Sequence, residues 1–232
     1  MTVIERRLYA ATGGDSGSLP VLLPTLGVSG VMHRWAASML GNSGSSVATW
    51  TPYTGNLELT QSTTTIRPVV GVVSGQKVLR TDGVSTVITA GSGMTNAKTM
   101  SVLLRSTEPS GTTVGLFSWD GGYVRRGSAG TVASTRIGAT AVTVPVDPTQ
   151  PQFHVITIIN DFAGGIGATV VDGTYATQAT DRENTNLILG SASTTYGAIE
   201  VLDVAVWGRA LSQTECQTVR AGFQTAYPGL VA

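Results

Sequence analysis

Three Asp-Gly dipeptides, which begin at residues 82, 120 and 172, most constrain what this 232-residue chain can fold into. Asp-Gly is a strong cue for a two-residue β-hairpin, because both residues tolerate the positive φ that such a turn needs. Each dipeptide lies between short strand-like segments: 78–81 and 84–89, 114–119 and 123–126, 166–171 and 175–178. Many short strands, without regular alternation of strands and helices, predict an all-β, antiparallel two-sheet sandwich.

The segment 199–227 predicts how the sandwich ends, with a buried strand followed by one short C-terminal helix. Apolar residues dominate up to Trp207 in an alternating pattern. Ser212 and Glu215 then have the spacing of a capping box, in which each side chain satisfies the other's backbone N–H. Four residues recur at helical spacing after this cap: Cys216, Val219, Phe223 and Tyr227.

Composition excludes several classes of function. Lys and Arg balance Asp and Glu at 14 each, so the basic surface that nucleic-acid binding requires is not expected. No apolar run reaches the ~20 residues of a membrane span, so membrane insertion is not expected. The single cysteine, Cys216, cannot form an intrachain disulfide and is expected to be a small buried side chain.

Residues 1–31 differ from the rest of the chain and predict an extended attachment arm, with the sandwich formed by residues 32–232. The first residues lack the apolar core of a secretory leader. Pro20 and Pro24 prevent a regular helix or central strand through an apolar run, which therefore needs a surface to cover it. That surface is either the domain's own flank or another chain. The side chains expected to anchor the arm are Arg6, Arg7, Leu19, Leu22, Leu23 and Leu26.

Three segments resemble motifs of the concanavalin A-like lectin/glucanase superfamily, in its laminin G-like jelly-roll branch. Residues 50–56, WTPYTGN, are similar to a W-x-D-x-S-G-N turn, although Pro52 stands where an acid is common. Arg67-Pro68 with residues 79–84, and the strand and helix start at 206–212, resemble two further motifs. The resemblance implies a jelly-roll sandwich over most of the chain. Domains of this kind with an added N-terminal segment resemble bacteriophage tail and other virion proteins.

No catalytic residue is predicted. Glucanases of this superfamily carry an E-x-D-x-x-E strand, and the nearest match here is Glu200 with Asp203. A separation of three places these carboxylates on opposite faces of a strand, whereas a retaining glycosidase needs them ~5 Å apart. His33 and His154 are too few for a transition-metal cluster and have no nucleophile beside them. No metal or other cofactor is expected, and calcium is a minor alternative.

The segment 117–126 is the best candidate for recognition. A hairpin tip with aromatic and acidic side chains offers a flat apolar face and hydrogen-bonding groups, as a sugar ring requires. Because neighbouring strand residues face opposite sides, one of two adjacent arginines should be exposed. The alternative is that the aromatic side chains cover the edge of the sandwich. The candidate glycan-binding residues are Trp119, Asp120, Tyr123, Arg125 and Arg126.

The sequence therefore predicts a non-enzymatic bacteriophage structural protein, in a minor tail or tail-tip position, with a lectin-like sandwich for host-surface glycan or for assembly. Its expected location is the virion, on the tail surface rather than the capsid, after synthesis in the host cytoplasm. Its expected partners are other virion proteins, further copies of the chain with a trimer favoured, and a host glycan. The alternatives are a carbohydrate-binding module of a bacterial surface system, a capsid decoration protein and, third, a glycan hydrolase.

Overall fold

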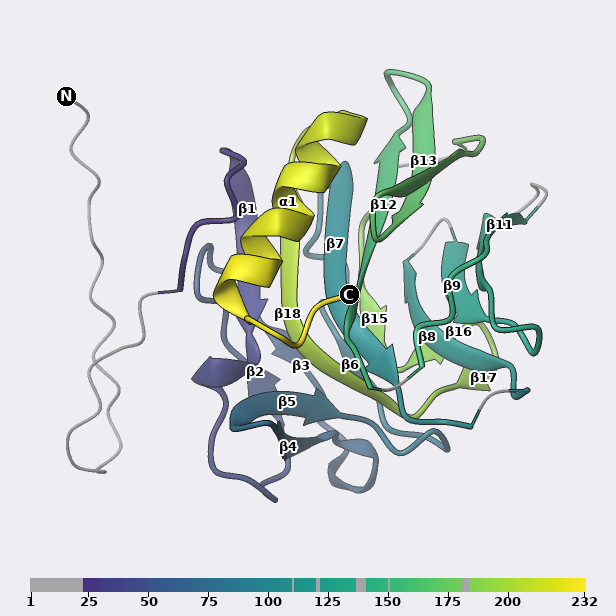
Figure 1. The fold of residues 1–232 in the computed structure, drawn as a ribbon. Helices are drawn as coiled ribbons and strands as arrows, with labels where there is room; N and C mark the ends of the chain where they lie inside the picture. The colour runs from purple at the N-terminus through teal and green to yellow at the C-terminus, as the bar shows by residue number, and fades with distance from the viewer. Residues whose placement is uncertain (1–22, 110, 120–121, 137–140, 150, 181–183) are drawn as a thin grey trace, which may run out of the picture.

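Two antiparallel β-sheets pack face to face, and one α-helix lies against the outer face of one of them (Figure 1). The computed structural model describes residues 23–232, except 110, 120–121, 137–140, 150 and 181–183. This arrangement confirms the predicted all-β, two-sheet sandwich with a short C-terminal helix. No helix in the described part of the chain is long and apolar enough to cross a membrane.

The sheet that carries the helix is called the covered sheet. Its strands follow one another in space as β14 (Thr174–Thr177), β13 (Ile166–Val171), β12 (His154–Asp161), β7 (Thr99–Ser106), β18 (Ile199–Trp207), β5 (Gln76–Arg80) and β4 (Val69–Val73). Strand β1 (Val31–Ala36) pairs with the second half of β18. The central strands β7 and β18 are buried along their whole length, including the polar residues that β7 carries, such as Thr99, Ser101 and Arg105.

No α-helix of the described residues lies over the second sheet, which is called the open sheet. Its strands follow one another as β11 (Val142–Val144), β10 (Val132–Arg136), β9 (Gly122–Arg126), β8 (Val114–Trp119), β15 (Ile188–Leu189), β6 (Ile88–Thr89), β3 (Leu59–Thr60) and β2 (Thr49–Trp50). Strands β16 (Ser191–Ala192) and β17 (Thr195–Tyr196) form a separate small hairpin. Single 3₁₀ turns lie at Ala37–Met39 and Thr64–Ile66.

The main hydrophobic core lies between the sheets, and a second core lies between the covered sheet and the helix. Successive side chains of a strand face opposite sides, so one strand supplies both cores. Along β18, Val204 and Val206 face the main core. Ala205 and Trp207 face the second core. The helix is therefore part of what buries the covered sheet and not an appendage.

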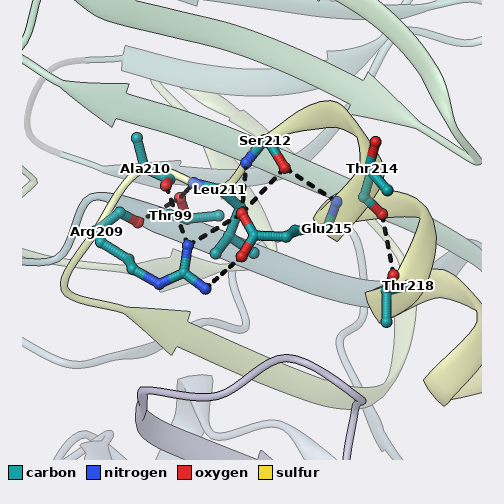
Figure 2. Close-up of polar contacts among 8 residues, drawn as sticks. All are labelled: Thr99, Arg209, Ala210, Leu211, Ser212, Thr214, Glu215 and Thr218. Atoms are coloured by element: carbon teal, nitrogen blue, oxygen red, sulfur yellow. Dashed lines mark hydrogen bonds and ion pairs between the residues drawn. The ribbon is translucent and has the colours of Figure 1, made fainter.

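Helix α1 (Gln213–Ala226) begins with the predicted capping box (Figure 2). The Glu215 N–H donates to the Ser212 hydroxyl at 3.3 Å, and the Ser212 N–H donates to the Glu215 carboxylate at 2.9 Å. Arg209 donates to the same carboxylate at 2.6 and 3.0 Å. The predicted apolar face is buried, and burial raises the pKa of the Cys216 thiol to about 11, in agreement with the small buried side chain expected.

The Asp-Gly dipeptides have different outcomes. Asp172-Gly173 forms the predicted hairpin between β13 and β14, with positive φ angles of 48° and 88°. Asp120-Gly121 lies outside the described residues, although the strands on either side of it pair as predicted. Asp82-Gly83 closes no hairpin, which corrects the prediction. The backbone N–H groups of residues 84, 85 and 86 all donate to Asp82 Oδ1, so its carboxylate shapes the connection that leads from β5 to β6 in the other sheet.

Part of the predicted arm packs on its own domain. Leu26 is 3% exposed and belongs to the second core. It lies so close to the helix that a Cβ atom on Gly222 would be 2.7 Å from the Leu26 Cα. The Pro24 carbonyl accepts a hydrogen bond from Arg34 Nη1 at 2.7 Å. Leu23 is half-buried, whereas four of the expected anchors lie outside the described residues: Arg6, Arg7, Leu19 and Leu22. For these, attachment to another chain stays a prediction.

Candidate functional site

Two of the predicted recognition residues, Trp119 and Arg126, face the interior of the sandwich. Trp119 is 4% exposed and belongs to the main core, so the expected exposed aromatic face is not there. Arg126 is fully buried. Its guanidinium donates to the carbonyls of Glu108, Pro109 and Thr112 at 2.5–3.0 Å, and so holds the loop between β7 and β8 in place. Both side chains are therefore corrected from binding candidates to structural ones.

Tyr123 and Arg125 lie on the opposite side of strand β9, where both are half-exposed on the outer face of the open sheet. The Arg125 Cζ is 5.7 Å from the centre of the Tyr123 ring, which is a cation–π contact. No carboxylate of the described residues forms an ion pair with Arg125. Asp120, the fifth predicted residue, lies outside the described part of the chain.

A row of mostly hydroxyl-bearing side chains crosses the open sheet to Tyr123. Each member is paired directly with the next across neighbouring strands, in the order Thr49, Thr60, Thr89, Ile188, Ser118 and Tyr123. The neighbours of these residues along each strand, such as Trp50, Leu59 and Phe117, are buried in the main core. The row therefore faces outward, and together with Arg125 it is called the open face.

The small hairpin β16–β17 rests on the open face beside Arg125. Gly115 pairs with Arg125 across β8 and β9, and a Cβ atom on it would lie 2.0 Å from the Thr195 carbonyl oxygen. It would also lie 2.6 Å from the Ala192 nitrogen, so only glycine lets this backbone approach. β16 contacts both β8 and β9, as Figure 1 shows at the lower right. Sequence reasoning missed this hairpin, although a glycine inside a strand is a signal for such close approach.

The acids nearest to a hydrolase motif, Glu200 and Asp203, lie on the outer face of the covered sheet. A register shift between Val201 and Asp203 interrupts the alternation of β18, so both carboxylates share this face and the predicted opposite facing is wrong. Glu200 accepts from Arg105 Nε at 2.7 Å and also from Arg80. The two acids are 2% and 0% exposed, which leaves neither open to a substrate.

Asp203 also belongs to a buried polar cluster with Arg34 and Tyr227. Arg34 Nη2 donates to its carboxylate at 2.7 Å, and the Tyr227 hydroxyl donates at 2.8 Å. Burial, followed by the adjacent Asp203 carboxylate, raises the pKa of Tyr227 above its ordinary value, so its hydroxyl stays a donor. This cluster joins β1, β18 and the end of α1, and every charge in it has a partner. The cluster therefore stabilises the fold and is not a binding or catalytic site.

The two histidines have structural surroundings as well. His154 lies on β12, and its Nδ1 is 2.6 Å from Oδ2 of Asp172, at the turn between β13 and β14. His33 is buried beside Trp35, and burial lowers its pKa. Within the described ranges, no group of three or more His, Cys, Asp or Glu side chains is arranged to hold a metal ion.

No family model matches this chain, and no curated protein matches it in sequence. Among solved structures, it is similar to the Trypanosoma rangeli sialidase in complex with sialic acid, with a TM-score of 0.65 and 13% identity over 88% of this chain. The same sialidase with 2,3-difluorosialic acid as a covalent intermediate gives a TM-score of 0.64 and 14% identity over 94% of this chain. The chain spans only 34–36% of the sialidase's length. At these identities, the likeness shows the fold.

A smaller likeness is to the CBM40 of Ruminococcus gnavus IT-sialidase bound to α2,3 sialyllactose, with a TM-score of 0.41 and 13% identity. It covers 53% of this chain and 82% of that one. The similarity to sialidase structures contradicts the predicted role as a non-enzymatic bacteriophage structural protein. Because this chain spans only about a third of the matched enzymes' length, their activity is not carried over to it.

Proposed function

We propose that this domain binds carbohydrate on the open face and does not cleave it. The observation that carries the proposal is the outward row of Thr and Ser hydroxyls that leads to Tyr123 and Arg125, with the β16–β17 hairpin beside them. Hydroxyls pair with sugar hydroxyls, and an amphipathic aromatic ring packs against the apolar face of a sugar. The resemblance to concanavalin A-like lectins points in the same direction.

The proposal that binding occurs without catalysis rests on the state of the acids. Glycosidases in general use two carboxyl groups that flank the scissile bond. Glu200 and Asp203 are each held by arginines beneath other side chains. In the described part of the chain, the outward row on the open face carries hydroxyl, isoleucine, tyrosine and arginine side chains and no carboxylate. The row therefore supplies contacts to a glycan, and the exposed carboxylate of Glu58, two residues from Thr60, bonds to Thr51 and has no second acid of the described residues paired with it there for the two-carboxylate chemistry of a glycosidase.

The binding proposal is tested by titrating a panel of neutral and acidic oligosaccharides into the purified domain and into its Tyr123→Ala variant. We expect Tyr123→Ala to weaken binding of the preferred glycan about tenfold, which corresponds to ~1.4 kcal/mol, because one packing face is lost. Its melting temperature should stay nearly unchanged, since Tyr123 is half-exposed. Phe162→Ala is the matched control, because Phe162 is an aromatic residue that is 50% exposed beside the covered sheet.

Two results would contradict the proposal. Binding that Phe162→Ala weakens as much as Tyr123→Ala would move the site away from the open face, and no binding across the panel would remove the function. Incubation of the same glycans should release no product. Product release that is lost in Glu200→Gln or Asp203→Asn would show that the domain is a hydrolase.

A further inference from the structure

Arg125 differs from the other arginine side chains that the structure describes, because its guanidinium has no hydrogen-bond acceptor. Four of them donate to carboxylates: Arg34, Arg80, Arg105 and Arg209. Three more donate to backbone carbonyls: Arg67, Arg126 and Arg220. Among arginine side chains that the structure describes, only that of Arg125 is left with its contact to the Tyr123 ring. Its five N–H donors are therefore open to water or to a ligand.

The surroundings of Arg125 restrict where its guanidinium lies. The Tyr123 ring contacts it along β9, and the β16–β17 hairpin occupies the space above Gly115, its direct partner on β8. A guanidinium that is already placed loses less side-chain entropy when it binds than one on a free side chain. The positive charge also stands beside a row whose own side chains are uncharged. No acidic side chain in this row competes with a ligand for the Arg125 guanidinium.

We propose that Arg125 makes the glycan ligand an acidic one, whose carboxylate pairs with the guanidinium while the rest of the sugar lies along the open face. This inference rests on the proposed glycan binding and names its ligand class. A guanidinium and a carboxylate match in geometry and form two parallel hydrogen bonds, each stronger than one between neutral groups. A neutral sugar would leave the charge of Arg125 unused. Sialic acids and uronic acids both carry such a carboxylate and share this chemistry.

The test compares each acidic glycan with its own carboxyl-reduced form, so that only the charge changes. The probes are an α2,8-linked sialic acid oligomer and an oligogalacturonate, each with its reduced counterpart, titrated calorimetrically into the full chain. We expect at least one acidic form to bind about tenfold to a hundredfold more tightly than its reduced form. The acid that shows this preference identifies the source of the carboxylate. Dextran sulfate against dextran tests whether any anion suffices.

Variants then assign the preference to one side chain. Arg125→Gln should abolish the preference for the acidic form, because it weakens binding of the acidic form about tenfold to a hundredfold more than binding of the reduced form. Arg125→Lys should keep part of the preference, because it retains the charge but loses the paired donors. Lys77→Gln removes one positive charge from the covered sheet, where Lys77 donates to the Leu40 carbonyl, and should leave the preference intact. Melting temperatures of all variants are measured alongside.

The outcomes separate this inference from the proposed function. If acidic and reduced forms bind equally, or if Arg125→Gln weakens both alike, the inference is overturned while glycan binding stands. An equal preference for dextran sulfate would also overturn it, because the carboxylate would not be the group recognised. If neither form binds, or if binding is indifferent to Tyr123→Ala, the proposed function itself fails.

Discussion

The outer faces of the two sheets have the same kind of backbone but differ in whether their charged side chains are paired. On the covered face, two buried carboxylates are each matched to a guanidinium, Asp203 to that of Arg34 and Glu200 to that of Arg105. On the open face, hydroxyls dominate and Arg125 has no acid partner in the described structure. Burial imposes pairing, since an unpaired buried charge costs several kcal/mol. A face left in water is free of that constraint and can keep a charge for a ligand.

Arg125 and Arg126 repeat this contrast within two consecutive residues. Arg126 points into the sandwich and uses its donors on loop carbonyls at 2.5–3.0 Å. Arg125 points out, and its guanidinium lies over an aromatic ring. The side of the strand therefore decides the role of each side chain, and the residue type does not. The following experiments measure that difference, beginning with the largest expected effect.

The largest effect is expected for Arg34→Met on the covered face. The substitution leaves the Asp203 carboxylate buried without its cation, so we expect a loss of ~3–5 kcal/mol in the free energy of unfolding, measured with urea. The double variant Arg34→Met with Asp203→Leu should recover most of that loss, because it removes both charges together. A double variant as unstable as the single one would show that the cluster acts through something other than charge pairing.

Trp119 and Tyr123 compare the two sides of one hairpin. Trp119→Ala should lower the free energy of unfolding by ~3–5 kcal/mol, because it leaves a cavity in the main core. Tyr123→Ala should lower it by less than ~1 kcal/mol, since the ring is half-exposed. Denaturation of both variants under the same conditions provides the measurement. Equal losses would mean that Tyr123 is structural, and the open face would lose its aromatic contact.

The smallest effect is expected for Glu215→Gln at the start of α1. The guanidinium of Arg209, followed by the Ser212 N–H, lowers the pKa of Glu215 from 4.5 to about 2. Because the folded-state pKa is the lower one, the charged carboxylate stabilises the fold above pH 4.5, and this contribution is lost as the pH falls from there towards about 2. Glu215 is partly exposed, so solvent screening reduces the effect to ~0.5–1 kcal/mol.

Unfolding of the wild type and of Glu215→Gln should therefore be compared at neutral pH and near pH 2. The variant should be less stable at neutral pH and nearly equal to the wild type at the lower pH. A difference between the two proteins that is independent of pH would mean that the carboxylate's charge does not contribute, and that the cap acts through neutral hydrogen bonds alone.

Local patterns determine much of this fold because near neighbours in sequence set them. The Ser212–Glu215 cap, the apolar spacing of α1 and the Asp172-Gly173 turn all follow from residues within a few positions of one another. Their energies depend on backbone geometry that a short segment already contains. The alternation of β9 likewise predicts that Arg125 and Arg126 face opposite sides.

Only the tertiary structure decides which side of each strand faces the core and which side faces water. Alternation does not say where the second sheet packs, so the sequence alone leaves open whether Trp119 or Tyr123, and which arginine, faces water. The register shift before Asp203 and the hairpin on Gly115 also arise from contacts between distant segments, and each changes the role of nearby side chains. The physical reason is that the two possible orientations of a strand have the same local backbone geometry and differ only in which side chains they bury. That difference exists only once the sheets and the helix have come together.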